Sequence, residues 1–507
     1  MDCIYGHFAN FDFSLLNLLF PKNVNLNFSL RSRVLIIALM IVSTYGFINI
    51  NQSKSVFYKV GSFVGNDPKY YDELEAVASN GPYLNFVNNL NVKIMEKPTG
   101  YSRKNILKIE KRYKQLSKNI NMNRKVNNQS VVFILSESFS NPQNVPGVSL
   151  NKNPISYTKS LIKNSVGGNM ISDGYGGGTA NMEYEALTGL TLGNFSATLP
   201  TPYTQLVMHQ KRSNVFTINN LFPESVAIHP YSGSLYDRDR VFKKMKFGQF
   251  HYLNHQYPQK YLGKIGSNPY VSDKSAYKYL IHELGKNNHT QFIQLSTMQN
   301  HMPFNKNYYS SDRFKPVGNF SKSESQEIGN YANGIKYTDM ANKYLITRLK
   351  KMKKNVTLVF YGDHLPAIYT HVNMNKHGVK MHETPYFIWS NHSKLNKSIS
   401  YKALVGTYGF SSEVMQATGS KVSPYYAMLQ RVNEKLPIIG SKIANTTADP
   451  NLPDGGMNLI NTRTYKLMTT KGLNKVQKKL LKDYQMVQYD LTAGKHYINA
   501  DFTHINE

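Results

Sequence analysis

The chain has 507 residues, of which 41% are hydrophobic and 18% charged, and its formal net charge is +29. This composition is enough for a large folded domain and excludes a chain that is disordered throughout. The positive charge favours an anionic partner. Because no zinc-finger, RNP-like or KH-like pattern accompanies it, we expect a membrane surface or an acidic polymer, and no nucleic acid. Cys3 is the single cysteine, which excludes an intramolecular disulfide and a cysteine metal site.

The first predicted element is a transmembrane helix at about residues 34–50. The apolar run VLIIALMIVSTYGFI begins at Val34, and no charged residue follows until Lys54. A spanning helix needs about 20 mostly apolar residues, and uncharged polar residues can complete this one. Positive flanks stay inside the cell, so residues after 54 should lie outside. The N-terminal region is therefore predicted to be 1–53. The basic residues before the run are Lys22, Arg31 and Arg33.

Residues 54–128 are predicted to be a basic helical linker. Basic residues crowd the stretch 96–125, where apolar side chains recur at steps of three and four residues. This spacing is typical of an amphipathic helix. Two interpretations are equally supported: a solvated helix packed on the next domain, or a helix that faces anionic lipid headgroups. The apolar positions are Ile106, Ile109, Tyr113 and Leu116.

Residues 129–440 alternate short apolar runs with helical stretches, and residues 441–507 are expected to be a C-terminal appendage. Continuous apolar strands between helices predict an α/β fold with a mostly parallel central sheet and helices on both faces. Catalytic groups in such sheets lie past the carboxyl ends of strands. The predicted helices include 275–286 and 324–353. The predicted strands are 131–136, 215–218, 226–229, 291–296, 356–361 and 386–389.

Chemically competent residues follow two of these strands and one glycine run. VVFILS leads into Glu137, and VTLVFYG leads into Asp363 and His364. Between them, Thr179 follows three glycines and opens a predicted helix. Carboxylates and histidine are ligands for Mg²⁺, Mn²⁺ or Zn²⁺. A threonine hydroxyl needs a base or a cation to become a nucleophile, and a helix N-terminus favours a bound phosphate.

Four segments resemble the lipoteichoic acid synthase and phosphoglycerol transferase family of the alkaline phosphatase/sulfatase superfamily. The resemblance covers about residues 130–390 and keeps the family's order and spacing. It implies that one divalent ion, preferably Mn²⁺ with Mg²⁺ and Zn²⁺ as alternatives, binds Glu137, Thr179, Asp363 and His364. It also implies that Thr179 carries a covalent glycerol-phosphate intermediate. The segments are ESF (137–139), GGGTANMEYEALTG (176–189), NHMPF (300–304) and YGDHLP (361–366).

The family's headgroup pocket maps onto His229, Tyr236 and Arg238 in HPYSGSLYDRD. Tyr236 stands where the family has tryptophan, and Tyr231 stands where it has aspartate. Arg238 offers planar, permanently charged donors to a phosphate. His301 is expected to bind phosphate or to protonate a leaving group. His382 and Glu383 have two open interpretations, one on the acceptor side of the site and one purely structural.

The resemblance implies an extracellular enzyme anchored in the cell membrane of a Gram-positive-type bacterium. It would move glycerol phosphate from phosphatidylglycerol, through Thr179, onto lipoteichoic acid or a related surface glycan or glycolipid. A sulfatase is disfavoured because no C/S-x-P-x-R pattern surrounds Thr179. Two alternatives stay open. One is a phosphoethanolamine transferase of the same superfamily, and the other is a non-catalytic wall-binding or regulatory homologue.

Overall fold

The structure is a computed structural model, and its described residues fall into two compact units. One unit comprises Met1–Pro68 with Leu74–Asn91, and the other Lys69–Glu73 with Val92–Glu507. Cys3 and Lys54 lie outside the described residues. The described residues are 29–50, 55–66, 73–88, 90, 92–126, 128–196, 198–199, 201–309, 313–396, 404–441 and 457–505.

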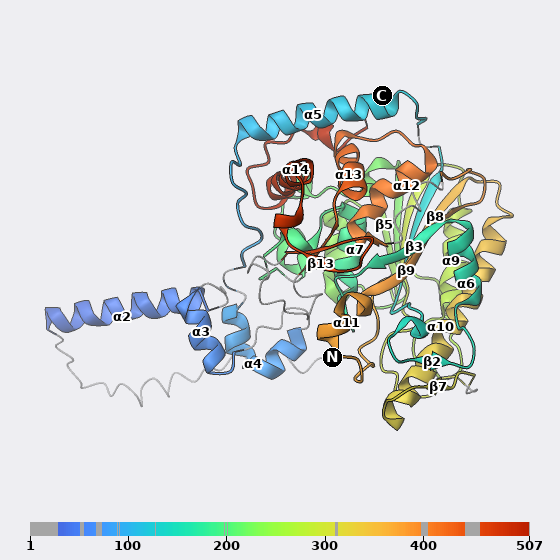
Figure 1. Cartoon of the computed structure of the whole chain (residues 1–507), viewed down its shortest axis with the longest axis horizontal. Helices are drawn as coiled ribbons and strands as arrows, with labels where there is room; N and C mark the ends of the chain where they lie inside the picture. Colours follow the sequence, from blue (N-terminus) through green and yellow to red (C-terminus); the bar gives the residue numbers. More distant parts are fainter. Residues whose placement is uncertain are drawn as a thin grey trace. The chain divides into compact units, whose positions relative to one another are not determined.

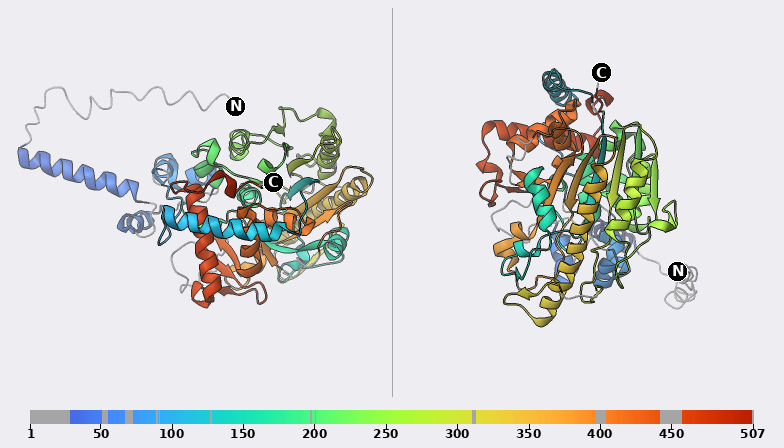
Figure 2. Two further views of the ribbon diagram at one scale, coloured as in Figure 1. Left: turned by 90° about the horizontal axis from the view of Figure 1, so that it is seen from above. Right: turned by 90° about the vertical axis from the view of Figure 1, so that its right-hand side faces the viewer.

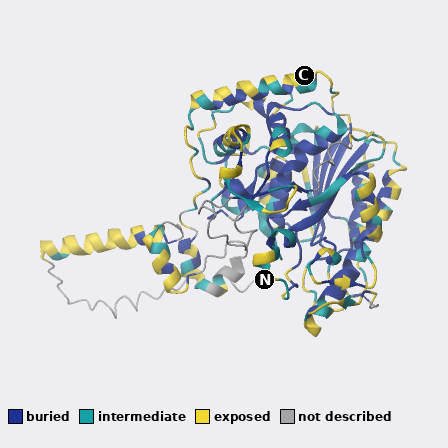
Figure 3. Cartoon of the chain, in the orientation of Figure 1, coloured by how far each residue is buried: buried dark blue, intermediate teal, exposed yellow. Residues whose placement is uncertain are grey.

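The first unit contains α2 (Leu30–Ile48), α3 (Val56–Phe63) and α4 (Glu73–Asn88). Helix α2 has 19 residues and is long and apolar enough to cross a membrane. The side chain of Ser29 caps it by accepting a hydrogen bond from the Ser32 amide. Figure 3 shows that most of α2 is exposed, as expected for a helix whose side chains contact lipid. It begins four residues before the predicted start and so includes Arg31 and Arg33 within its first turn.

The second unit is built on an eight-stranded sheet with the strand order β10-β3-β9-β8-β1-β6-β4-β5 (Figure 1). Strand β9 is antiparallel to both of its neighbours, and the other neighbouring pairs are parallel. Two small antiparallel sheets, β2-β7 and β11-β12-β13, accompany it. The strands are β1 (Ser130–Ser136), β2 (Ser149–Leu150), β3 (Val166–Ile171), β4 (Glu224–His229), β5 (Gln249–Tyr252), β6 (Gln291–Ser296), β7 (Pro316–Val317), β8 (Val356–Gly362), β9 (Glu383–Ser390), β10 (Leu404–Gly406), β11 (Ile438–Ser441), β12 (Met457–Ile460) and β13 (Leu467–Met468).

Helices cover both faces of this sheet (Figure 2). Along β1, Val131 and Phe133 belong to the hydrophobic core that holds α7, α8, α12, α13 and α14, while Val132 and Ile134 belong to the core beneath α6, α9 and α10. Alternate side chains of a strand point to opposite faces, so an unbroken apolar run fills both cores. The helices of this unit are α5 (Arg103–Asn121), α6 (Ser156–Asn164), α7 (Thr179–Thr188), α8 (Arg238–Lys244), α9 (Asp273–Leu284), α10 (Lys322–Leu349), α11 (Met374–Met381), α12 (Phe410–Thr418), α13 (Pro424–Lys435) and α14 (Lys475–Thr492).

The predicted fold class is confirmed, whereas the predicted strand at 215–218 is wrong. That segment leads into a short 3₁₀ helix, Ile218–Leu221. Thr217 and Asn220 cap this turn reciprocally, and the Asn220 side chain also donates to the Met245 carbonyl (3.0 Å). Side-chain hydrogen bonds of this kind compete with strand formation, although the local sequence is apolar.

The amphipathic helix α5 packs its apolar face within the second unit, against α13 and α14. Ile106 and Tyr113 are buried there, and most of the helix's basic side chains are exposed. Helix α14 also belongs to this unit, where Tyr484 is buried and donates to the Gly189 carbonyl (2.7 Å). The described part of the C-terminal segment therefore contributes to the hydrophobic core of the sheet domain.

Candidate functional site

The carboxyl ends of four adjacent strands bring the candidate residues together. In the order β8-β1-β6-β4, these ends carry Asp363, Glu137, Ser296 and His229. Glu137 is fixed to the next strand because its amide donates to Thr297 Oγ1 (3.2 Å). Residues separated by more than 200 positions in the chain therefore lie at one edge of the sheet, as the parallel arrangement requires.

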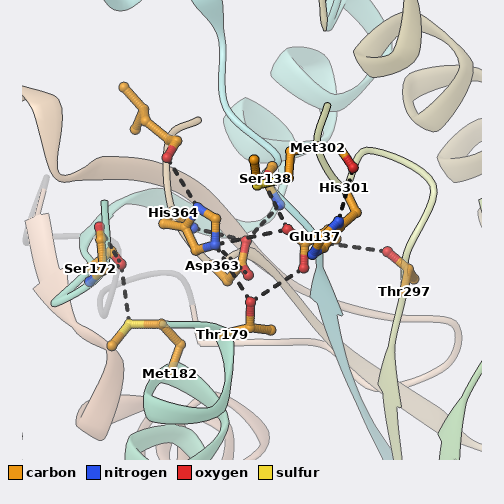
Figure 4. Close-up of polar contacts among 12 residues, drawn as sticks. Glu137, Ser138, Ser172, Thr179, Met182, Thr297, His301, Met302, Asp363 and His364 are labelled. Atoms are coloured by element: carbon orange, nitrogen blue, oxygen red, sulfur yellow. Dashed lines mark hydrogen bonds and ion pairs between the residues drawn. The ribbon is translucent and has the colours of Figure 1, made fainter. Parts of the chain in front are cut away.

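Thr179 enters this edge at the first position of α7. Gly178 precedes it with φ 93°, a left-handed backbone conformation that side chains disfavour. The Thr179 hydroxyl lies 3.3 Å from Glu137 Oε2 and 3.5 Å from His364 Nε2 (Figure 4). The glycine run therefore directs the chain so that a helix N-terminus and its first hydroxyl face the acidic strand ends.

The two carboxylates are held by the turn after β1. Asp363 Oδ1 accepts the amides of Ser138 (2.7 Å) and His364 (2.9 Å). The Ser138 hydroxyl donates to Glu137 Oε1 (2.9 Å), although Ser138 itself has φ 47°. A left-handed backbone is unfavourable for serine, and such strain is concentrated at functional sites. Asp363 Oδ2, in contrast, is buried without a hydrogen-bond partner among the described residues.

The donor atoms suit a divalent cation. His364 Nδ1 donates to the Leu365 carbonyl (3.0 Å), which leaves Nε2 facing the carboxylates, 3.3 Å from Asp363 Oδ2. Three possible metal-ligand atoms, one from each of Glu137, Asp363 and His364, lie within 4.8 Å of one another. Two carboxylates, one imidazole and a hydroxyl form a ligand set for Mn²⁺, Mg²⁺ or Zn²⁺. Asp363 Oδ2, which accepts no hydrogen bond among the described residues, is the kind of atom that such an ion would satisfy.

Burial, together with the neighbouring charge of Glu137, raises the pKa of Asp363 to about 7. Two buried carboxylates side by side disfavour ionisation of both. A bound cation would reverse this effect because it favours the charged form of its ligands. The electrostatics therefore agree with the ligand geometry.

Arg238 is fully buried and forms an ion pair with Glu183 of α7. Arg238 Nε lies 2.8 Å from Glu183 Oε2, and Nη1 donates to the Leu235 carbonyl (3.3 Å). Nη2 is buried with no hydrogen-bond partner among the described residues. The guanidinium was predicted to contact a phosphate, and an unpartnered Nη2 is a donor that could do so.

His229 and Glu183 share one anchor, Ser296. His229 Nδ1 donates to the Ser296 carbonyl (2.9 Å), and the Ser296 hydroxyl donates to Glu183 Oε1. Burial, with the charge of Arg238 nearby, holds the pKa of His229 well below its usual value. The ring is therefore neutral, and its Nε2 has no hydrogen-bond partner among the described residues. This nitrogen can accept a hydrogen bond from a ligand hydroxyl.

The remaining predicted pocket residues are aromatic or histidine side chains. The Tyr236 ring centroid lies 5.1 Å from the Arg238 guanidinium carbon, a cation–π distance. His301 Nδ1 lies 3.1 Å from both the Tyr270 hydroxyl and the Met302 carbonyl. Tyr231, in the aspartate position, packs edge-on against the His229 ring. The roles of His301 and Tyr236 stay predictions, as do the ligand contacts predicted for His229 and Arg238.

His382 and Glu383 lie beside the site in buried positions. His382 Nδ1 donates to the Gly378 carbonyl (2.7 Å), and burial lowers the pKa of His382 to about 4. The Glu383 carboxylate accepts from Lys380 (2.8 Å) and Asn169 (3.0 Å). Both interpretations of these two residues, one on the acceptor side and one structural, stay predictions.

Sequence reasoning missed Glu183, Ser296 and Ser138. Glu183 had a local signal, since it is four residues after Thr179 on a helix whose other positions are mostly apolar or small. Ser296 and Ser138 carried none, because serine at the end of a strand is common in any turn.

Comparison with known proteins identifies the family and several related structures. The Sulfatase family model matches residues 129–420. The structure of the Streptococcus pyogenes phosphoglycerol transferase GacH in complex with sn-glycerol-1-phosphate has 32% sequence identity and a TM-score of 0.69, covering 82% of this chain and 100% of that one. The lipoteichoic acid synthase LtaP from Listeria monocytogenes is 18% identical with a TM-score of 0.46, covering 77% of this chain and 100% of that one.

A putative cyclic beta-1,2-glucan modification protein of Rhizobium meliloti (strain 1021) is 26% identical over 461 residues. The match covers 86% of this chain but 65% of that protein's length. The family model alone covers more than half of this chain. The chain therefore belongs to the sulfatase family, within the alkaline phosphatase/sulfatase superfamily.

Proposed function

We propose that this protein is a membrane-anchored phosphoglycerol transferase with Thr179 as its nucleophile. The observation that carries the proposal is the position of the Thr179 hydroxyl, 3.3 Å from Glu137 Oε2 and 3.5 Å from His364 Nε2, at the N-terminus of a helix. Such a hydroxyl can be activated, and the helix N-terminus favours the phosphate that it attacks.

The proposed reaction has two steps, each of which transfers glycerol phosphate from one oxygen to another. In the first, Thr179 Oγ1 bonds to the phosphorus of phosphatidylglycerol, and the bond from phosphorus to the diacylglycerol oxygen breaks. The proton lost by Thr179 is balanced by the proton gained by diacylglycerol. In the second, an acceptor hydroxyl bonds to the phosphorus and releases Thr179 with its proton restored. Lipoteichoic acid or a related surface glycan or glycolipid is the proposed acceptor.

One divalent cation, preferably Mn²⁺, would be held by Glu137, Thr179, Asp363 and His364. It would supply Lewis acidity at the phosphoryl oxygen and lower the pKa of the hydroxyl. The residues of the chain do the positioning. His229 Nε2 accepts a hydrogen bond from a headgroup hydroxyl, and Arg238 Nη2 donates one to the phosphate. Both atoms are buried without a hydrogen-bond partner in the described part of the chain. His301 is proposed to protonate the leaving oxygen.

Three further observations support the headgroup, the anchor and the acceptor. The streptococcal relative at 32% identity is a phosphoglycerol transferase solved with sn-glycerol-1-phosphate. Helix α2 is long and apolar enough to place the enzyme at the membrane that holds its lipid donor. The similarity to a putative cyclic beta-1,2-glucan modification protein supports a glycan as one class of acceptor.

The test is turnover of headgroup-labelled lipids by the purified full chain in detergent with Mn²⁺. Phosphatidylglycerol should yield diacylglycerol and a glycerol-phosphate adduct on the protein, and a chelator should stop both. If phosphatidylethanolamine is consumed while phosphatidylglycerol is not, the enzyme is a phosphoethanolamine transferase. If the protein binds metal but turns over neither lipid, the non-catalytic alternative holds.

A further inference from the structure

A basic groove of about 600 Å³ lies between α11 and β13. Both elements are labelled in Figure 1. Its volume is that of a ligand-binding cleft. The basic side chains that line it are Lys376, His377, Lys380 and Lys466. Its described lining contains no arginine, so these residues offer single ammonium groups and no bidentate forks.

The groove has an excess of positive charge. Glu383 is the one acidic residue in its described lining, and that carboxylate is buried and bound by Lys380 and Asn169. Lys376 and Lys466 are exposed and form no ion pair among the residues that the structure describes. Two lysines of the lining thus have no acidic partner in the described structure, which favours an anionic occupant.

The groove borders the loop that carries the nucleophile. Glu383 pairs with Ile171 across β9 and β3. Directly after β3, the Ser172 amide donates to the His382 carbonyl (2.8 Å). The His382 ring also lies 5.9 Å from the ring of Tyr175, four residues before Thr179. One wall of the groove is therefore continuous with the glycine-rich loop.

We propose that this groove binds the acceptor as a chain bearing repeated phosphodiester groups, and so holds its growing end near Thr179. This inference rests on the proposed function. Lysine ammonium groups attract a phosphate as point charges from many directions, whereas arginine would fix one geometry. A lysine-lined groove thus suits a chain whose phosphates must shift as the chain lengthens. Its concave form fits a chain better than a flat lipid surface.

The first experiment measures binding without turnover. A fluorescent oligomer of glycerol phosphate is titrated into the full chain in detergent. Lys376→Glu combined with Lys466→Glu should weaken binding roughly tenfold or more, and added salt should weaken binding to the parent. The control, Lys350→Glu with Lys351→Glu at the end of α10, changes the net charge equally on exposed residues outside the groove and should bind as the parent does.

The second experiment separates this inference from the proposed function. The groove variant should lose transfer to the oligomer but still release diacylglycerol from phosphatidylglycerol when water is the acceptor. The inference is overturned if the groove variant binds the oligomer as tightly as the parent does. It is also overturned if the control variant loses as much affinity, or if the parent binds phosphatidylglycerol vesicles but not the oligomer. Loss of diacylglycerol release would place the lysines at the donor site and also overturn it. A parent that binds the oligomer in this groove but never releases diacylglycerol refutes the proposed function and leaves the groove's ligand class standing.

Discussion

Glu183 and Arg238 form a buried ion pair, with 2.8 Å between Oε2 and Nε, that connects the helix of the proposed nucleophile to the proposed headgroup pocket. Both side chains are at most 1% exposed. A buried charge of this kind is tolerated only when it is paired and hydrogen-bonded. The pair also turns the guanidinium so that Nη2 has no other partner in the described structure.

The first prediction concerns this arginine. Arg238→Lys retains the charge, but one ammonium group cannot bind Glu183 and also contact a phosphate as the fork does. Loss of one charge-assisted hydrogen bond costs about 1.5–3 kcal/mol, so kcat/KM for phosphatidylglycerol should fall about tenfold to over a hundredfold. Steady-state kinetics measure this. Arg240→Lys is the matched control, because Arg240 is exposed and pairs with Asp237. An equal loss of kcat/KM in both variants would show that Arg238 does not contact the substrate.

The second prediction concerns the nucleophile. The Thr179 hydroxyl lies at long hydrogen-bond distances from Glu137 and His364, 3.3 and 3.5 Å, so Thr179→Ala should fold and melt like the parent. It should show no turnover and no glycerol-phosphate adduct by intact-protein mass spectrometry. Thr179→Ser restores a hydroxyl at the same place and should recover part of the activity. Full activity of the alanine variant would contradict a covalent mechanism.

The third prediction concerns metal removal. Asp363 has its pKa raised to about 7, so in metal-free protein it is protonated when folded but ionised when unfolded between about pH 4 and pH 7. The metal-free parent should therefore lose stability as the pH rises through this range. Asp363→Asn cannot ionise and should lack that component. Thermal melts with chelator measure both proteins.

Adding Mn²⁺ to the same two proteins completes this test. The melting temperature of the parent should rise by mass action, and that of Asp363→Asn should rise less because an ionised ligand is missing. Equal rises for both would show that Asp363 is no ligand.

The fourth prediction concerns His382, whose pKa is lowered to about 4 by burial. The unfolded chain takes up a proton near the ordinary value of 6.5 while the folded protein does not, so stability falls as the pH drops from about 6.5 towards 4. Between pH 7 and pH 5 the loss should be about 2 kcal/mol. His382→Asn can still donate to the Gly378 carbonyl and should show less of this loss in denaturant titrations.

The control for this prediction is His392→Asn, which removes an exposed histidine. It should retain the full pH dependence of the parent. An undiminished loss in His382→Asn would mean that another buried group, such as His229, is responsible for it.

The sequence by itself determined the strands whose ends carry Glu137, Asp363 and His364. Unbroken apolar runs such as 131–136 and 356–361 are a local signal for strands buried on both faces, and parallel strands place their carboxyl ends together. Strand β3 was missed because Gly167 and Gly168 weaken the strand pattern. A Cβ at Gly167 would lie 2.8 Å from the Tyr386 carbonyl oxygen, so the neighbouring strand accounts for this glycine.

Only the tertiary structure decided how the proposed headgroup pocket is held. Glu183 and Arg238 are 55 residues apart, and Ser296 lies 113 residues beyond Glu183. A lone arginine in sequence is most often a surface residue, whereas this one is buried because the fold supplies its carboxylate. The residue type alone gives the charge of each side chain. Which charges meet depends on the packing of α7 and α8 over the sheet, since a buried charge is stable only beside its partner.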